Sequence, residues 1–229
     1  MIMGIDNLPL FIAAGLLLNL TPGPDVLYIM ASGVRGGARA GVGAALGLTA
    51  GCFVHIAAAA IGVSALIAAS ATAFTVLKWL GAAYLVYMGI NMLRPVAKVV
   101  ATENIANGAM DTWANGQKDS QVLKTVFLRG FWTNALNPKV AMFFLAFLPQ
   151  FIAPDAANKT LSFALLGLIF NINALPVNVG YGLAARWLSQ KFSSTRPTRL
   201  GSAVRWLERG AGALFIYFGI KLALSEQRS

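Results

Sequence analysis

Two short proline-containing breaks interrupt otherwise apolar stretches of this chain. The first is Thr21-Pro22-Gly23-Pro24-Asp25 and the second is Asn137-Pro138-Lys139. Each surrounding stretch is long enough to cross a bilayer, where lipid cannot hydrogen-bond the backbone groups that a broken helix leaves unpaired. Breaks at that depth persist only when they are buried in protein or line a polar cavity, and an ionisable residue there is a sign of function. The paired breaks therefore predict a transport site inside a membrane protein.

The composition supports a polytopic membrane protein. Of the 229 residues, 57% are hydrophobic and 11% are charged, whereas soluble domains carry about 25% charged residues. The net charge of +10 raises nucleic-acid binding as an alternative, but the basic residues gather in loops between apolar segments, as expected beside anionic lipid. We therefore expect no nucleic-acid partner. With one cysteine (Cys52) and one histidine (His55), the chain is not expected to hold a soft metal or a cofactor.

We predict an all-α membrane protein with six transmembrane helices. Their approximate ranges are 8–31, 40–69, 74–93, 122–151, 160–188 and 204–224. The first and fourth contain the breaks, and the third and sixth share a Tyr-x-Gly-Ile core at 87–90 and 217–220. If each repeat has three spans, an odd number, the second repeat enters the membrane in the opposite direction to the first. The sequence therefore predicts two inverted three-helix repeats. The expected single transporter domain, 1–229, comprises repeat 1 (1–95), a cytoplasmic loop (96–121) and repeat 2 (122–229).

The basic residues predict the orientation of these spans. They are concentrated after the first, third and fifth spans, and the N-terminus up to Asn7 has none. The positive-inside rule puts these loops in the cytoplasm and both termini in the periplasm. The residues concerned are Arg35 and Arg39; Arg94, Lys98, Lys118 and Lys124; and Arg186, Lys191, Arg196, Arg199 and Arg205.

Asp25 is the only carboxylate well inside a predicted span. It can bind a substrate ammonium group, and partial desolvation would favour its neutral form, so that it can also exchange a proton during transport. The alternative is that it only complements the positive end of the helix that restarts after Pro24. Thr21 is expected to cap that helix, while Pro22 and Gly23 open the backbone.

The second break repeats this arrangement. Asn137 is expected to cap a restarting helix, Pro138 fits its first position, and Lys139 follows. Three roles stay open for Lys139: neutralising Asp25, binding a substrate carboxylate, or reaching toward the membrane interface. Asn134 lies one turn earlier and is a further candidate for the site. A plain proline kink that aids packing is the alternative to a binding site at each break.

Polar residues of two other spans are also candidates. Asn171 and Asn178 are seven residues apart and share a helix face, so they are expected to bind substrate or, alternatively, to bond to a neighbouring helix. His55 fits a proton relay or an interhelical hydrogen bond, of which the second is favoured.

Both breaks resemble the signatures of the LysE/RhtB family of amino-acid exporters. Segment 19–25, Asn-Leu-Thr-Pro-Gly-Pro-Asp, is similar to the first signature, and segment 130–139, Gly-Phe-Trp-Thr-Asn-Ala-Leu-Asn-Pro-Lys, is similar to the second. One departure is Thr21, where many members have asparagine. The resemblance covers nearly the whole chain and implies efflux of amino acids across the bacterial inner membrane, driven by the proton gradient.

We therefore predict a secondary transporter that exports neutral or homoserine-, threonine- or leucine-like amino acids by proton antiport. Its expected partners are the amino acid, protons and the lipid bilayer, and a homo-oligomer is compatible with the sequence. The alternatives are an exporter of another small solute or cation, a passive channel and a membrane-embedded enzyme, for which no nucleophile motif is present. The candidate substrate-binding residues are Pro22, Gly23, Pro24, Asp25, Asn134, Asn137, Pro138, Lys139, Asn171 and Asn178, with Asp25 also the candidate for proton coupling.

Overall fold

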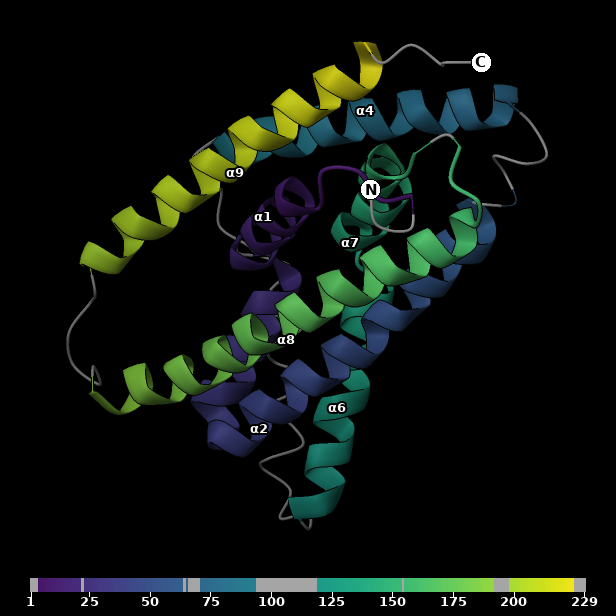
Figure 1. Cartoon of the computed structure of the whole chain (residues 1–229). Coiled ribbons are helices and arrows are strands. Elements are labelled where there is room, and N and C mark those ends of the chain that lie inside the picture. Colours follow the sequence, from purple (N-terminus) through teal and green to yellow (C-terminus); the bar gives the residue numbers. More distant parts are fainter. Residues whose placement is uncertain are drawn as a thin grey trace.

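The described part of the chain is helical, and Figure 1 shows the helices packed around the short helices α1 and α7. The computed structural model describes residues 4–21, 23–63, 65, 71–93, 119–153, 155–191 and 198–224. Over these ranges the chain forms no named strand, only an isolated antiparallel bridge between Ile5 and Ile152. The elements are α1 (Leu8–Leu20), α2 (Pro24–Ala57), the π-helix η1 (Ala58–Val63), α4 (Ala71–Leu93), α6 (Asp119–Ala135), α7 (Pro138–Met142), the π-helix η2 (Phe143–Phe147), the 3₁₀ helix η3 (Leu148–Phe151), α8 (Lys159–Lys191) and α9 (Thr198–Leu224).

The helices are interrupted at both predicted breaks. Helix α1 ends at Leu20 and α2 begins at Pro24, while α6 ends at Ala135 and α7 begins at Pro138. Helix α2 is itself kinked at Gly37, whose φ of 74° lies in the left-handed region that only glycine adopts readily. The kink divides α2 into a short arm next to the first break and a longer arm that continues into η1.

Small residues allow three pairs of helices to approach closely: α2 with α8, α2 with α6, and α4 with α9. Gly41 of α2 faces Gly182 of α8, and Gly47 of α2 lies against the carbonyl of Phe127 in α6. Gly43, Gly47 and Gly51, which recur every four residues in α2, all face α6 and form a packing surface. In lipid the hydrophobic effect does not drive helices together, so small residues that allow close packing are needed to hold them.

Helices α4 and α9 lie side by side (Figure 1) and meet through matching glycines. A Cβ atom at Gly89 would lie 2.5 Å from the carbonyl oxygen of Gly212, and one at Gly219 would lie 2.8 Å from that of Ala82. Gly89 and Gly219 hold the same position in the shared Tyr-x-Gly-Ile motif, so the motif glycine of each helix packs against the backbone of the other. In each contact the motif glycine faces an earlier residue of the partner helix, Gly212 or Ala82. The two helices therefore run antiparallel.

A phenylalanine-rich core lies between α1, η2, η3, α8 and α9. The rings of Phe143 and Phe147 stack with centroids 4.9 Å apart, and Phe147 meets Phe218 of α9 edge to face at 4.5 Å. This core adjoins the region of the breaks, since Leu18, Val140 and Phe170 belong both to it and to the cavity described below. Its fixed packing supports the backbone from which the polar side chains project.

The length and composition of the helices fit a membrane protein. Within the described residues, two helical stretches are long and apolar enough to cross a membrane, Pro24–Gly62 and Lys159–Trp187. Shorter apolar helices cover Leu8–Leu20, Pro138–Phe151 and Gly212–Lys221. An all-α architecture is thus confirmed, while the division into six spans stays a prediction.

Several helix starts differ from the sequence prediction. No helix begins at the predicted 40, because α2 runs from Pro24 through the kink at Gly37. Helix α4 begins at Ala71, α6 at Asp119 and α9 at Thr198, earlier than the predicted 74, 122 and 204. The predicted starts followed the first apolar residues, whereas helices extend into polar segments because their hydrogen bonds do not require apolar side chains. The rest of the predicted loop, up to residue 118, lies outside the described residues.

Replacing Gly47 by alanine should weaken the contact between α2 and α6. Its new methyl group would collide with the backbone carbonyl of Phe127, and overpacking of this kind costs about 1–3 kcal/mol. The matched control is Gly180→Ala in α8, where an added Cβ meets nothing within 4 Å. Thermal unfolding in detergent should show a lower midpoint for Gly47→Ala alone. Equal midpoints for both variants would contradict the close contact.

Candidate functional site

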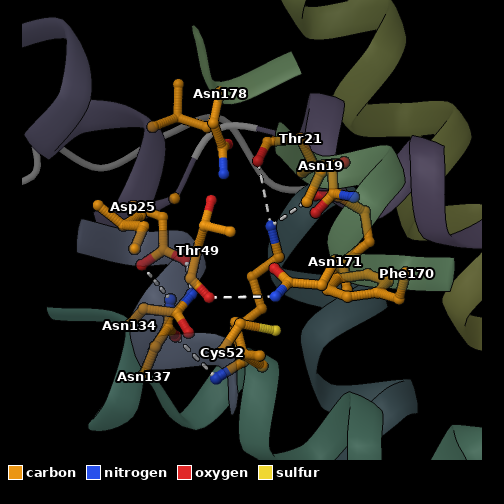
Figure 2. Close-up of a pocket in the computed structure, with 17 residues that line it drawn as sticks. Asn19, Thr21, Asp25, Thr49, Cys52, Asn134, Asn137, Phe170, Asn171 and Asn178 are labelled. Atoms are coloured by element: carbon orange, nitrogen blue, oxygen red, sulfur yellow. Dashed lines mark hydrogen bonds between the residues drawn. The ribbon is translucent and has the colours of Figure 1, made fainter. Parts of the chain in front are cut away.

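A small polar cavity lies where the two helix breaks face each other (Figure 2). Its volume is about 30 Å³, which gives room for water but not for a larger solute. The end of α1, both arms of α2, α6, α7 and α8 contribute to its wall. Its polar lining residues are Asn19, Thr21, Asp25, Thr49, Asn134, Asn137, Lys139, Asn171 and Asn178.

The Asp25 carboxylate is bound by two asparagine side chains from the other break. Asn134 donates from Nδ2 to Oδ2 of Asp25 at 2.7 Å, and Asn137 donates from Nδ2 to Oδ1 at 2.8 Å. The residues are 109 and 112 positions apart in the chain, so the contact joins its two halves. Both asparagines are buried and Asp25 is partly buried. The two neutral amides thus hold the carboxylate without cancelling its charge.

Asn137 also caps helix α7, as predicted. Its Oδ1 accepts from the backbone N–H of Lys139 at 2.9 Å, and Pro138 occupies the first helical position. Because the amide oxygen is used by the cap, the amide nitrogen must point the other way, toward Asp25. One side chain therefore stabilises its own restarted helix and contacts the opposite break.

Lys139 makes the corresponding contact in the other direction, from the second break to the first. Its Nζ donates to the backbone carbonyls of Leu18 at 3.0 Å and Thr21 at 3.1 Å, at the end of α1. These carbonyls belong to the helix end, where intrahelical partners are missing. Of the three predicted roles, reaching toward the interface is wrong, because the ammonium group is turned inward to these carbonyls. It retains one N–H that neither carbonyl uses.

The contacts of the two breaks are reciprocal. Asp25 and Lys139 each follow the proline that begins a helix, and each reaches two positions of the opposite half. Those positions are separated by three residues in both halves, 18 and 21 in one and 134 and 137 in the other. Each break therefore supplies the hydrogen bonds that the other lacks.

His55 forms the interhelical hydrogen bond that was favoured from the sequence. Its Nε2 lies 2.8 Å from the backbone carbonyl of Asn134, which also accepts from the N–H of Asn137. A carbonyl only accepts, so Nε2 carries the proton. The buried ring also stacks on Phe144 at 6.0 Å. His55 thereby fixes the end of α6 from which Asn134 reaches Asp25.

Three side-chain atoms in the cavity wall are buried without a hydrogen-bond partner. They are Nδ2 of Asn19 and the Oδ1 atoms of Asn134 and Asn171. Such groups cost free energy when unpaired, so they point to a ligand, water included. Figure 2 shows Asn19 well apart from Asn134, so a free donor and a free acceptor lie at different parts of the cavity.

Helix α8 contributes both predicted asparagines to the cavity. Asn171 is 3% exposed and donates from Nδ2 to the carbonyl of Thr49 at 3.1 Å, which leaves its Oδ1 free. Asn178 lies two turns further along and lines the same cavity. Asn173 is absent from the lining, as the helix geometry predicts.

The prolines and Thr21 differ from the other predicted site residues. Pro24 and Pro138 begin α2 and α7 but do not line the cavity, whereas Gly23 does. Pro22 lies outside the described residues. The predicted cap by Thr21 is wrong: Gly23 is the N-cap of α2, and the Thr21 hydroxyl donates back to the Leu17 carbonyl at 2.6 Å. The backbone is extended at Thr21 and at Gly23, and the threonine side chain turns back toward α1.

Sequence reasoning missed several residues of the wall, among them Asn19, Thr49, Cys52 and Phe170. Asn19 was noticed only as part of a motif. Thr49 carries the lone hydroxyl in the apolar stretch between Arg39 and His55, a signal that could have identified it. Cys52 follows Thr49 by one turn on the same helix face, whereas Phe170 is indistinguishable in the sequence from a packing residue.

The helical, apolar fold fits a membrane protein, and a polar cavity at two helix breaks suits a transporter. The chain belongs to the LysE family: the model of the LysE type translocator matches residues 16–226. The resemblance of the two break motifs is thereby confirmed, and the chain is classed with transporters rather than enzymes.

Bacterial relatives match the chain along most of its length. It is 32% identical over 226 residues to an uncharacterised membrane protein of Pseudomonas aeruginosa, covering 96% of each chain. It is 29% identical over 213 residues to the homoserine/homoserine lactone efflux protein of Salmonella typhimurium, covering 93% of this chain and 94% of the relative. It is 31% identical over 163 residues to the leucine efflux protein of an Enterobacter species, covering 71% and 72%. No solved structure matches the chain.

Replacing Lys139 by methionine should destabilise the fold. The carbonyls of Leu18 and Thr21 would lose the ammonium group that bonds them, and hydrogen bonds to charged groups contribute about 1.5–3 kcal/mol. Lys221→Met, at an exposed position of α9, is the control and should change little. Unfolding in detergent, followed by circular dichroism, measures both. A Lys139→Met variant as stable as the control would show that these bonds contribute nothing.

Proposed function

We propose that this protein exports neutral or homoserine-like amino acids across the bacterial inner membrane by proton antiport. The names of two relatives, a homoserine/homoserine lactone efflux protein and a leucine efflux protein, support the substrate class. The observation that carries the proposal is the cavity at the paired breaks, which is lined by Asp25, Lys139 and three polar atoms without a hydrogen-bond partner.

The cavity wall matches the two charged ends of a free amino acid. The third N–H of Lys139 and Nδ2 of Asn19 are available to a carboxylate. Oδ1 of Asn134 and Oδ1 of Asn171 are available to accept from an ammonium group, and the Asp25 carboxylate is bonded to Asn134. A zwitterion would therefore satisfy donors and acceptors that are otherwise unpaired. Asp25 is the one carboxylate in the wall, which favours neutral over dibasic substrates.

Asp25 is suited to couple the proton to this exchange. As a carboxylate it accepts from Asn134 on one oxygen and from Asn137 on the other. Protonation turns one oxygen into an O–H donor, which no longer accepts from the facing N–H group in the same geometry. Proton binding would thus loosen one of the two contacts between the halves, and deprotonation would restore it.

An inverted repeat would give these movements a structural basis. Two reciprocal sets of contacts support it: the glycines of α4 and α9, and the contacts of Asp25 and Lys139 across the breaks. We propose repeats at 1–95 and 122–229 that rock against each other around the cavity. The basic residues favour six spans with both termini in the periplasm.

The small cavity volume supports interpreting the described conformation as a closed state in this cycle. A space of about 30 Å³ admits water but is too small for an amino acid. Substrate entry therefore requires the two halves to separate toward one side of the membrane.

Asp25→Asn should abolish proton-coupled export while leaving the protein folded. The amide cannot carry the transported proton, although its size matches that of the carboxylate. Efflux of labelled homoserine or leucine from proteoliposomes under an imposed pH gradient measures the effect. Asp155→Asn, at an exposed position outside the cavity, should transport normally. Unchanged coupled efflux by Asp25→Asn would remove Asp25 from the mechanism.

A competition assay on the unaltered protein tests the substrate class. Competition by metal ions instead of amino acids would overturn it.

Asn171→Leu should raise the KM for substrate. It removes the free Oδ1 proposed to accept from the ammonium group, and a hydrogen bond to a charged group corresponds to about 10- to 100-fold in binding. Asn173→Leu, two residues away on the same helix and outside the cavity wall, is the matched control. Initial efflux rates at several substrate concentrations separate KM from kcat. If both variants shift KM equally, Asn171 does not contact the substrate.

A further inference from the structure

An open apolar groove of about 580 Å³ lies between α2 and α6, outside the cavity of the breaks. Its floor and walls are formed by small and apolar side chains, and two cations stand at its rim, Arg39 of α2 and Lys124 of α6. Both cations are exposed, and no acidic residue is among the groove's lining residues. The lining residues are Ala38, Arg39, Val42, Gly43, Leu46, Leu123, Lys124 and Phe127.

The register of the two helices puts both cations at the same end of the groove. Along α2, Gly43, Gly47 and Gly51 face Leu123, Phe127 and Phe131 of α6, respectively. Both series advance by four residues in the same direction, so these helices run parallel. Arg39 precedes Gly43 by one turn, and Lys124 follows Leu123 directly, so both cations lie near the beginnings of the paired segments.

The groove is therefore polarised along its length. Its cationic end is next to the Gly37 kink in α2 and the start of α6 at Asp119. Away from that end it is lined by Leu46, which is 45% exposed, and by Phe127. In a chain of this class, such a surface faces lipid, with the helix beginnings at the level of the headgroups. A basic pocket between membrane helices is suited to an anionic headgroup.

We propose that this groove binds an anionic phospholipid. Its phosphate would contact Arg39 and Lys124, and an acyl chain would lie along Val42, Leu46 and Phe127. The two cations match the negative headgroup, and the apolar lining matches the chain, so the complete lipid fits better than a soluble phosphate. The occupant would bridge α2 to α6, which carries Asn134 and leads to the second break.

Lipid retention on the purified full-length protein tests the proposal. Native mass spectrometry after titration with phosphatidylglycerol or phosphatidylcholine should show preferential retention of phosphatidylglycerol. Each juxtamembrane cation contributes about fivefold to binding of anionic lipid, so Arg39→Gln with Lys124→Gln should reduce affinity about 25-fold. The charge-matched control, Lys159→Gln with Lys221→Gln, removes two cations outside the groove and should retain the lipid.

Two further variants separate the headgroup from the acyl chain. Arg39→Lys with Lys124→Arg keeps both charges and should preserve binding, while Leu46→Trp fills the groove and should weaken it. Glycerol 3-phosphate should fail to displace the lipid. The proposal is overturned by equal retention of the two lipids, by an equal loss in the control pair, or by displacement with glycerol 3-phosphate together with unaffected binding to Leu46→Trp.

Discussion

The carboxylate of Asp25, held by the amides of Asn134 and Asn137, is the interaction on which the rest of the site depends. A helix broken inside a membrane must find partners for its freed groups within the protein. Here the partners come from the other break: two amides reach Asp25, and Lys139 reaches the carbonyls at the end of α1. Neither break is satisfied alone, so both must form together, and a polar cavity remains between them.

The neutral partners of Asp25 suit the transport cycle proposed above, in which the site opens and closes. The amides that hold Asp25 are neutral, so their hydrogen bonds can be exchanged without separating a buried ion pair, which would be costly. Asn137 also caps α7, and His55 holds the carbonyl of Asn134. A change at Asp25 is therefore transmitted directly to the beginning of α7 and the end of α6. Close glycine contacts between α2, α6 and α8 lie beside this cluster, and in the proposed cycle they are the surfaces along which the two halves move.

Local features of the site were predictable from the sequence, and long-range ones were not. Proline and asparagine act within one turn, so the breaks and the cap by Asn137 followed from their positions. The partners of Asp25 lie 109 and 112 residues away, and nothing local specifies them. Lys139 bonds backbone carbonyls, which every residue has, so its partners carry no signal in the sequence. Thr21 was misjudged because the N-cap of α2 is Gly23, so no side chain caps this helix.

The accessibility of Cys52 tests most directly whether the cavity at the breaks is the transport site. It is the sole cysteine of the chain, it is 3% exposed, and it lines the cavity. A membrane-impermeant thiol reagent can therefore be applied to either face of oriented vesicles while the proton gradient is varied. If the halves alternate around this cavity, Cys52 reacts from both faces during transport, and homoserine or leucine slows its modification. A thiol that stays unreactive from both faces during active efflux, or one whose labelling no amino acid slows, would contradict the account.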